Sequence, residues 1–286
     1  MTTPFQASLA QIDIAALDPA RNLEQMTRIA KVEADAGSKL IVFPELSNTG
    51  YVEPMVPGAP FSPGIASLGD YAARLYAAAD DHDGSTVTEL AALASLRGIY
   101  LVVGLALRHP VIRGRLANAS MLIGPEGVVA TYSKAHLWHS EKLYFAEGND
   151  FPVARTPVGS IGMQICYDIR FPEVSRALAL GGADIIANVW ASFRADNEPV
   201  ADDDLFVHRA YTRAQENGTF FLSCNRVGLQ SGNRFMGRSV IAGPDGTILA
   251  ASRSEAEEIV RCEIDLEDVV RYRSYVGLWN DRRSGF

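Results

Sequence analysis

The amino-acid sequence predicts an α/β fold in which strands and helices alternate along the chain. Three observations carry this prediction: short apolar runs typical of strands, amphipathic stretches between them, and turns rich in Gly and Pro at their borders. A β-α-β unit comes first, because strand-like residues 5–14 and the helical pattern of 22–37 precede the apolar run 40–46. Such a unit places its two strands in parallel within a layered structure.

The later elements continue this alternation. The expected helices span residues 67–80, 85–98, 171–183 and 204–218, and the expected strands or hairpins span 100–108, 118–134, 152–166, 184–190, 219–227, 237–251 and 257–264. Between the first unit and the next helix, the Gly- and Pro-rich loop 48–64 is expected to form the rim of a pocket. The acidic run Asp202–Asp204 suits the N-terminus of the helix that follows it.

Composition narrows the class of protein. The 286 residues are 48% hydrophobic and 21% charged, and we expect them to form a single domain over residues 1–286. The net charge is −8 and the basic residues are scattered, which argues against a nucleic-acid partner. The start of the chain lacks the pattern of a secretory signal, and no apolar run reaches about 18 residues. We therefore expect a cytoplasmic protein without a membrane partner.

The cysteines argue against a metal or disulfide framework. Cys166, Cys224 and Cys262 are far apart in sequence and form no C-x-x-C pair. Since their number is odd, at least one thiol has no partner within the chain. Such a thiol is either a small buried core residue or a nucleophile.

Three of the expected strands each deliver one reactive side chain at or just beyond their end. These side chains are Glu45, Lys134 and Cys166, and α/β folds usually place their functional sites at strand ends. Taken singly, a Glu or Lys after a strand is usually a solvated surface charge. The residues alone therefore leave a catalytic role open.

The segments around these residues, FPELSNTGY, YSKAHLW and ICYDIRFPE, together resemble the nitrilase superfamily of carbon–nitrogen hydrolases. Members of that superfamily carry Glu, Lys and Cys in this order. Further matches are EKLYFAEGND, RAYTRAQENG, SCNRVG and GRSVIAGPDG, so the resemblance spans nearly the whole chain. It implies a four-layer α-β-β-α sandwich, a single carbon–nitrogen hydrolase domain, and assembly into homodimers or higher homo-oligomers. Because the sequence has no cluster of metal-ligand residues, we expect no metal or other cofactor.

The resemblance also implies roles for the site residues. Glu45 is the expected base, Cys166 the nucleophile, and Lys134 an oxyanion donor together with the backbone N–H of Tyr167. A second carboxylate assists this triad in the family, and Glu141 matches its position better than Glu147 because the sequence KLYF follows it. The expected product of the first half-reaction is a thioester.

The residues after the nucleophile narrow the substrate class. The run Cys166-Tyr167 followed by DIRFPE resembles the omega-amidase branch, whose members hydrolyse the terminal amide of small dicarboxylic monoamides. Arg170 is then either the partner of a substrate carboxylate or a structural ion-pair partner of Asp168 or Glu173. The segment ASFRADNEPVADDDL departs from that branch, which leaves the substrate within the amidases open.

Aromatic and polar residues complete the expected substrate pocket. Tyr51, Tyr167, Trp190 and Ser192 are candidates to contact the acyl group, as is Phe193, although aromatic residues after a strand often serve packing alone.

Several other functions are alternatives to the amidase prediction. Within the superfamily, the alternatives are an N-carbamoyl amine or amino-acid amidohydrolase and a nitrilase, and outside catalysis a silent binding protein on the same scaffold. A metal hydrolase would draw on the acidic run Asp80–Asp83 or on His136 and His139, but no recognised ligand pattern appears. A Cys-His dyad would need His136 or His208, and nothing in the sequence pairs either with Cys166.

Overall fold

The structure, a computed structural model, describes residues 3–52, 65–194 and 205–283. Three expectations fall partly or wholly outside these ranges: most of the loop 48–64, the acidic run Asp202–Asp204, and most of the segment that departs from the omega-amidase pattern.

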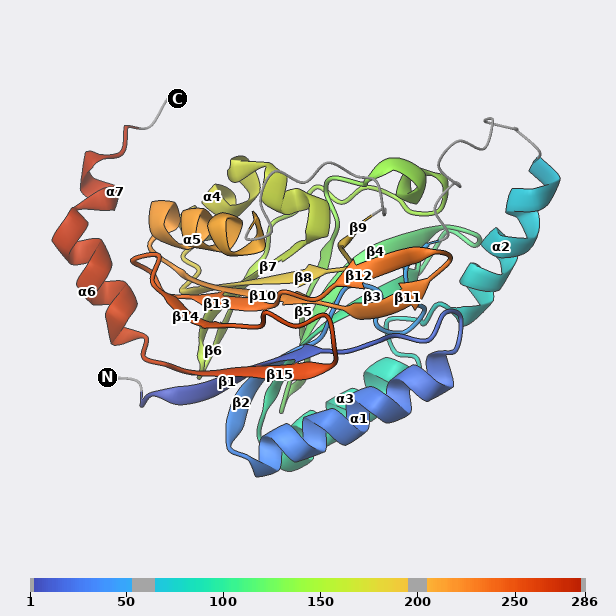
Figure 1. Ribbon diagram of the computed structural model, residues 1–286, viewed down its shortest axis with the longest axis horizontal. Helices are drawn as coiled ribbons and strands as arrows, with labels where there is room; N and C mark the ends of the chain where they lie inside the picture. The colour runs from blue at the N-terminus through green and yellow to red at the C-terminus, as the bar shows by residue number, and fades with distance from the viewer. Residues whose placement is uncertain (1–2, 53–64, 195–204, 284–286) are drawn as a thin grey trace.

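Two six-stranded sheets form the centre of the described structure (Figure 1). The first sheet has the order β15-β1-β2-β3-β4-β5, and β1, β2 and β3 run in parallel. Its strands are β1 (Phe5–Gln11), β2 (Ser38–Val42), β3 (Tyr100–Arg108), β4 (Leu116–Gly124), β5 (Gly127–Ser133) and β15 (Glu258–Ile264).

The second sheet has the order β14-β13-β10-β8-β7-β6, with β7, β8 and β10 in parallel. Its strands are β6 (Val153–Thr156), β7 (Gly159–Ile165), β8 (Ile185–Trp190), β10 (Phe220–Asn225), β13 (Val240–Ala242) and β14 (Ile248–Ala251). A small third sheet, β11-β12-β9, consists of β9 (Phe193–Arg194), β11 (Val227–Gln230) and β12 (Asn233–Met236).

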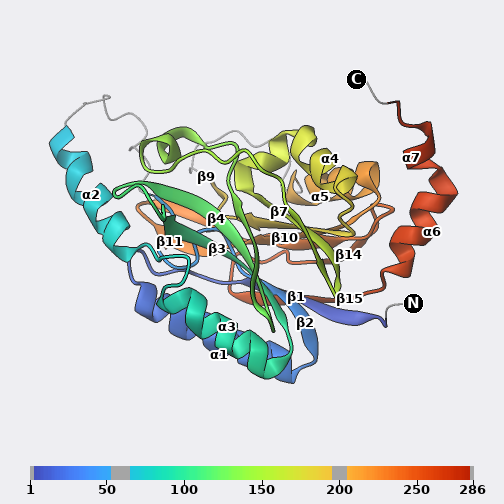
Figure 2. The ribbon, with the colours of Figure 1, turned by 180° about the vertical axis from the view of Figure 1, so that it is seen from behind.

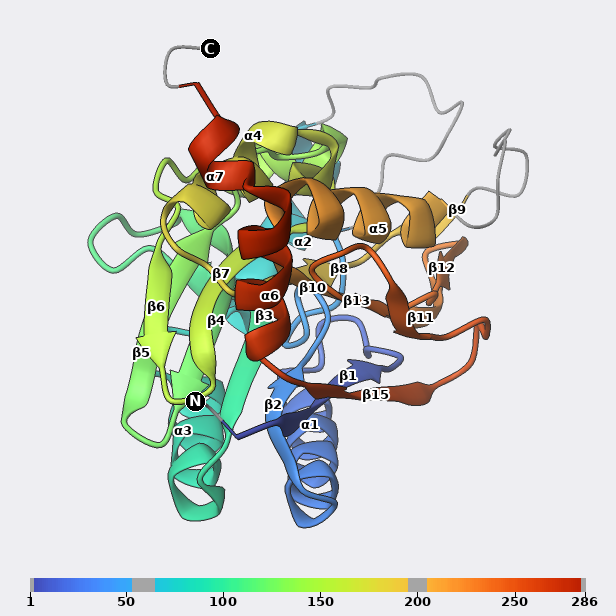
Figure 3. The same cartoon turned by 90° about the vertical axis from the view of Figure 1, so that its left-hand side faces the viewer.

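Helices cover the outer faces of both large sheets. On the first sheet lie α1 (Pro19–Asp35) and α3 (Ser85–Arg97), and on the second lie α4 (Pro172–Leu180) and α5 (Leu205–Asn217). Figures 1 and 3 show the resulting order of helices, sheet, sheet and helices. The predicted α/β class and four-layer sandwich are therefore confirmed.

Three apolar clusters hold these layers together. The cluster between the sheets is made by the alternate side chains of both, such as Leu9 and Val42 facing Met163 and Ala187. The other two clusters lie under α1 and α3 and under α4 and α5. Because successive side chains of a strand point to opposite faces, each sheet supplies apolar residues to two layers.

Two further helical segments lie at opposite ends of the sandwich. Helix α2 (Ile65–Ala78) projects at one end, and α6 (Glu267–Val276) with α7 (Leu278–Asp281) forms an arm along the other (Figure 2). None of the described helices is both long and apolar enough to cross a membrane.

The boundaries of several elements differ from the sequence-based expectation for local reasons. Strand β2 ends at Val42, whereas an end at residue 46 was expected, because Pro44 has no N–H for the ladder and Leu46 has a φ of 52°. Helix α1 begins three residues early, since the Asp18 carboxylate caps it by accepting from Arg21 N and Pro19 suits its first turn. The third sheet and the arm α6–α7 were not predicted.

Candidate active site

The three reactive side chains of the sequence analysis lie at one edge of the sandwich. Glu45 stands three residues beyond β2, Lys134 directly follows β5, and Cys166 directly follows β7 as the first residue of the 3-10 helix η2 (Cys166–Arg170). The expectation that Lys134 lies just beyond its strand is confirmed. Glu45 and Cys166 were expected within the last residues of their strands and lie beyond them.

Lys134 lies between two carboxylates. Its Nζ is 2.7 Å from Glu45 Oε1 and 2.8 Å from Glu141 Oε1, and none of the three side chains has exposed surface. Glu141 lies in the 3-10 helix η1 (His139–Leu143), and its Oε2 accepts from Trp138 N at 3.1 Å. Two negative charges around one buried cation leave this group with a net charge of −1 when all three are ionised.

The pKa values of this group reflect its burial. Burial raises the pKa of Glu45 and Glu141 adds to the rise, while the adjacent Lys134 opposes it. For Lys134, burial alone would lower the pKa, but the carboxylates of Glu141 and Glu45 raise it well above the ordinary value. Lys134 is therefore cationic, and Glu45 is a carboxylate that takes up a proton more readily than an exposed Glu.

Glu45 is held by donors from three parts of the chain. Besides Lys134, Asn118 Nδ2 donates to Oε1 at 2.7 Å and the backbone N–H of Ala191 donates to Oε2 at 2.9 Å. These bonds fix both carboxylate oxygens. Because both of its oxygens are held in this way, the Glu45 carboxylate has a defined orientation toward its neighbours, as a general base requires.

Tyr51 holds the second carboxylate, that of Glu141, in position. Its hydroxyl donates to Glu141 Oε1, and its ring packs edge-on against Phe193 and Phe235. Its backbone is clamped by Gln230, whose Nε2 donates to Tyr51 O at 2.5 Å and whose Oε1 accepts from Tyr51 N at 3.1 Å. The side chain expected to contact substrate thus holds Glu141 in place.

Cys166 sits on a strained strand-to-helix turn. Its φ is 48°, a left-handed conformation that is uncommon for residues other than Gly. The indole N–H of Trp190 donates to Cys166 O at 2.8 Å and stabilises this turn. Because the first N–H groups of a helix lack partners within it, the N–H of Tyr167 is available beside the thiol.

The thiol of Cys166 is neutral at rest. Its residue is partly exposed, but burial of the thiol and the nearby Glu45 raise its pKa well above the ordinary value. Lys134 and the N–H of Ala191 act in the opposite direction and favour the thiolate. A base is therefore needed to remove the proton when the sulfur reacts.

Sequence reasoning missed several groups of the site. Asn118 lies in strand β4 and binds Glu45, and its only sequence signal is a buried polar residue within an apolar run. Asp168 stabilises the turn that begins at Cys166. Its carboxylate accepts hydrogen bonds from Ile165 N, Tyr132 Oη and His136 N at 2.7–3.0 Å. The donor Ala191 N–H is a backbone group and has no sequence signal.

The predicted substrate-contacting residues differ in their surroundings. Arg170 is exposed and its guanidinium lies 5.7 Å from the ring centroid of Tyr167, while Asp168, one of its two expected ion-pair partners, is taken up by other groups. The backbone N–H of Ser192 donates to Asn225 Oδ1 at 2.9 Å. Trp190 is buried and bonded to Cys166 O, so it contacts the nucleophile's turn.

The histidines named as alternatives have other contacts. His136 Nδ1 lies 2.9 Å from Asp168 Oδ1, and its ring stacks on Phe171 at 3.7 Å. His139 packs edge-on against Trp138. Within the described ranges, no group of three His, Cys, Asp or Glu side chains is arranged to hold a metal ion.

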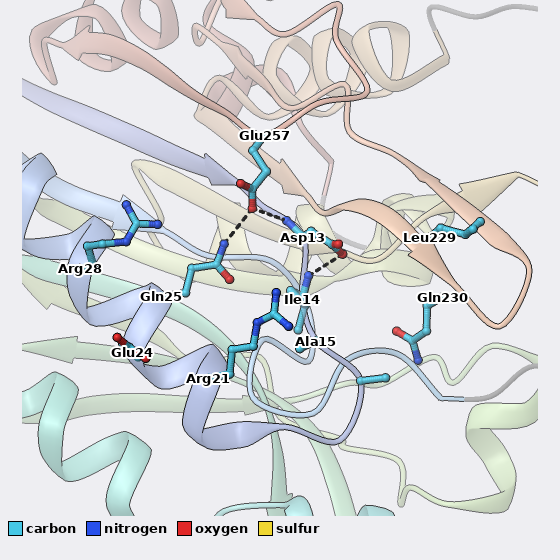
Figure 4. A pocket seen from close by; sticks show the side chains of 11 residues that line it. Asp13, Ile14, Ala15, Arg21, Glu24, Gln25, Arg28, Leu229, Gln230 and Glu257 are labelled. Atoms are coloured by element: carbon cyan, nitrogen blue, oxygen red, sulfur yellow. Dashed lines mark hydrogen bonds between the residues drawn. The ribbon is translucent and has the colours of Figure 1, made fainter.

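A separate polar pocket of about 400 Å³ opens beside helix α1 (Figure 4). Its wall includes Arg21, Arg28 and Glu257, and Glu257 accepts from Gln25 Nε2 at 2.8 Å and from the backbone N–H of Asp13. Gln230 also lines it, so the pocket borders the clamp on Tyr51. The residues that line this pocket include no cysteine or lysine.

Comparisons with known proteins match nearly the whole chain. The sequence model of the family described as carbon-nitrogen hydrolase matches residues 6–274. The chain is 29% identical to a nitrilase of Pyrococcus abyssi, with 98% of both chains covered. It is 31% identical to a 2-oxoglutaramate amidase of Bacillus subtilis, with 96% of both covered.

A solved structure with a bound group is also similar. It is a mutant of the amidase from Nesterenkonia sp. AN1 in which the acetamide moiety of fluoroacetamide is covalently added at the active-site cysteine. The TM-score is 0.73 and the sequence identity is 26%, with 97% of both chains covered.

Proposed function

Because the chain belongs to the carbon–nitrogen hydrolase family, we propose that it hydrolyses small primary amides to carboxylic acids and ammonia, with Cys166 as nucleophile. The observation that carries this proposal is the buried group of Glu45, Lys134 and Glu141 beside a neutral thiol. The amidase relative and the cysteine adduct of the similar structure support the same chemistry.

The first half-reaction forms a thioester. Glu45 takes the proton of the Cys166 thiol as sulfur attacks the amide carbon, and the carbonyl oxygen becomes an oxyanion. The protonated Glu45 then gives this proton to the nitrogen. The carbon–nitrogen bond breaks, ammonia leaves, and the acyl group stays on sulfur.

Lys134 stabilises the oxyanion together with the N–H of Tyr167. An ammonium has three N–H donors, and Glu45 and Glu141 accept from two of them, so the third is left for the substrate. One well-placed donor contributes about 3 kcal/mol to such a transition state. Glu141 and Tyr51 hold the ammonium in position.

Water completes the cycle. Glu45 removes a proton from water, which attacks the thioester carbon, and the carbon–sulfur bond breaks as Glu45 returns the proton to sulfur. The products are the carboxylic acid and the free thiol. The raised pKa of Glu45 suits a group that gains and loses a proton in each half-reaction.

Within the primary amides, we expect the omega-amides of dicarboxylic acids to be the best substrates. Arg170 supports this choice, because it lies four residues after Cys166 and has no ionic partner among the described residues. A guanidinium binds a carboxylate through two parallel hydrogen bonds.

The test is ammonia release at matched concentrations from succinamate, butyramide, N-carbamoyl-β-alanine and butyronitrile. Amides should react fastest, with succinamate ahead of butyramide. Faster hydrolysis of the nitrile contradicts the amidase proposal and favours a nitrilase, and faster hydrolysis of the carbamoyl compound favours the amidohydrolase. A lack of turnover with all four favours a binding protein.

We also propose that the chain acts as one domain in a cytoplasmic homo-oligomer, with no nucleic-acid or membrane partner. The three cysteines are free, which suits a reducing compartment. The arm α6–α7 presents exposed apolar side chains, including Tyr275 and Val270, that a second copy could cover. Light scattering on the purified chain measures the assembly, and a monomer at micromolar concentration contradicts it.

A further inference from the structure

Two arginines from different elements lie in the neighbourhood of the nucleophile. Arg170 ends helix η2, four residues after Cys166, and Arg209 lies in helix α5. Arg209 is close enough to both Arg170 and Cys166 for their charges to act on it. Helix α5 thus brings a second cation to the region that Arg170 already occupies.

The packing of α5 accounts for this placement. One turn beyond Arg209, the guanidinium of Arg213 donates to Ile169 O through Nε at 3.0 Å and Nη2 at 2.8 Å. One turn before it, Phe206 packs on Trp190 with ring centroids 4.6 Å apart, and Trp190 itself binds Cys166 O. Residues three and four apart share a helix face, so Arg209 lies on the face held against the turn of Cys166.

Neither cation has an anionic partner in the part of the chain that the structure describes. Among the described residues, neither Arg170 nor Arg209 has a carboxylate within ion-pair distance, whereas Arg213 pairs with Glu216. Arg209 is half-buried, and this burial with the repulsion from Arg170 lowers its pKa to about 10. Two like charges near each other, with no counterion among the described residues, disfavour the empty site and favour the binding of an anion.

We propose that Arg209 is a specificity-determining residue that, together with Arg170, binds the carboxylate at the far end of an omega-amide substrate. This inference rests on the proposed amidase function and adds Arg209 to it. A carboxylate between two guanidinium groups can accept from both, and this arrangement places the amide end toward Cys166. A neutral amide of equal length gains nothing from either arginine.

The experiment compares kcat/KM for succinamate and for the neutral butyramide in the full chain. We expect Arg209→Leu to lower the value for succinamate at least tenfold, mainly through KM, and to leave that for butyramide within about twofold. Arg209→Lys keeps the charge but loses the paired donors, so it should fall between. Arg28→Leu, in the pocket beside α1, is the control for loss of one positive charge.

Binding gives a readout without turnover. The Cys166→Ala protein should bind succinamate in calorimetry, and adding Arg209→Leu should weaken that binding at least tenfold. Equal losses for both amides in Arg209→Leu, or no loss for either, would overturn the inference. A lower melting temperature with unchanged selectivity would also overturn it, since it would assign Arg209 an internal partner. Failure of the wild-type protein to release ammonia from either amide would instead reject the amidase function.

Discussion

The ammonium of Lys134 donates to the carboxylate of Glu45 across 2.7 Å, and neither side chain has any exposed surface. Removing charges from water is costly, and this pair persists because Glu141, Asn118 and Ala191 N–H complete its hydrogen bonds. A buried ion pair is weak evidence for stability in itself. Its position beside a neutral thiol indicates that the arrangement serves chemistry.

Replacing the cation should harm both activity and folding. In Lys134→Gln, two buried carboxylates lose their counterion, so we expect kcat to fall at least a thousandfold and the free energy of unfolding to fall by about 3–5 kcal/mol. The pKa of Glu45, which is already raised in the folded protein, should rise further in this variant. A group whose pKa is higher in the folded than in the unfolded state stabilises the fold at pH values below its unfolded pKa of 4.5. This stabilisation is lost as the pH increases through the folded-state pKa. The melting temperature should therefore fall less at pH 5 than at pH 8.

The control for this substitution is Lys142→Gln, which removes an exposed lysine next to Glu141 in sequence. Its free energy of unfolding should stay within about 0.5 kcal/mol of the wild type. An equal loss of melting temperature at both pH values in Lys134→Gln would contradict the account.

Removing the proposed base, Glu45, should abolish the acidic limb of the pH profile, which is the decrease of kcat/KM at low pH. Burial raises the pKa of Glu45, so kcat/KM of the wild type should rise with pH through a value above the usual 4.5. Glu45→Gln keeps the shape but cannot take a proton, and kcat should fall at least a thousandfold. Glu147→Gln, at an exposed position, is the matched control and should keep wild-type activity. More than a tenth of the activity left in Glu45→Gln would exclude this residue as the base.

Asn118 should adjust the pKa of the proposed base, Glu45. Its donated hydrogen bond lowers the pKa of Glu45, so Asn118→Ala should shift the acidic limb of kcat/KM to higher pH and lower kcat about tenfold. A purely structural residue would lower activity without moving that limb. The control is Asn233→Ala, which removes another buried amide from the small third sheet. An unchanged limb in Asn118→Ala would remove its positioning role.

The reactivity of Cys166 should follow its raised pKa. Only the thiolate reacts with iodoacetamide, so the rate of alkylation should still increase beyond pH 9. Lys134 lowers this pKa, and the Lys134→Gln protein should therefore need a still higher pH for the same rate. The rate is measured by mass spectrometry of the Cys166 peptide across pH 7–10. A plateau below pH 8 in the wild type would mean that the thiol is already ionised at rest.

The sequence predicted the candidate site from reactive residues that stand at the ends of apolar strands. Glu45, Lys134 and Cys166 follow apolar strands, and the parallel strands of each sheet end at the same edge. Their exact boundaries were less predictable. Pro44 ends β2 early, and the left-handed φ of Cys166 depends on hydrogen bonds to Asp168, two residues later, and to Trp190 at the end of the neighbouring strand β8.

Other parts of the site depend on tertiary packing alone. Asn118 is one of two polar residues in its strand, the other being Ser120, and only the approach of Glu45 distinguishes it. Arg209 gains its position because Arg213 ties α5 to Ile169, a contact between elements far apart in sequence. The arm α6–α7 lies at the end of the sandwich with few buried residues, so its apolar pattern is weak.

Mass spectrometry of protein quenched in acid while it hydrolyses butyramide tests whether Cys166 carries the acyl group during turnover. We expect one butyryl group on the Cys166 peptide, and added hydroxylamine should convert it to butyrohydroxamate. The Cys262→Ala protein should behave like the wild type, and Cys166→Ala should lose both the adduct and turnover while keeping its fold. An acyl group on any other residue, or more than about a hundredth of the wild-type rate in folded Cys166→Ala, would contradict the claim.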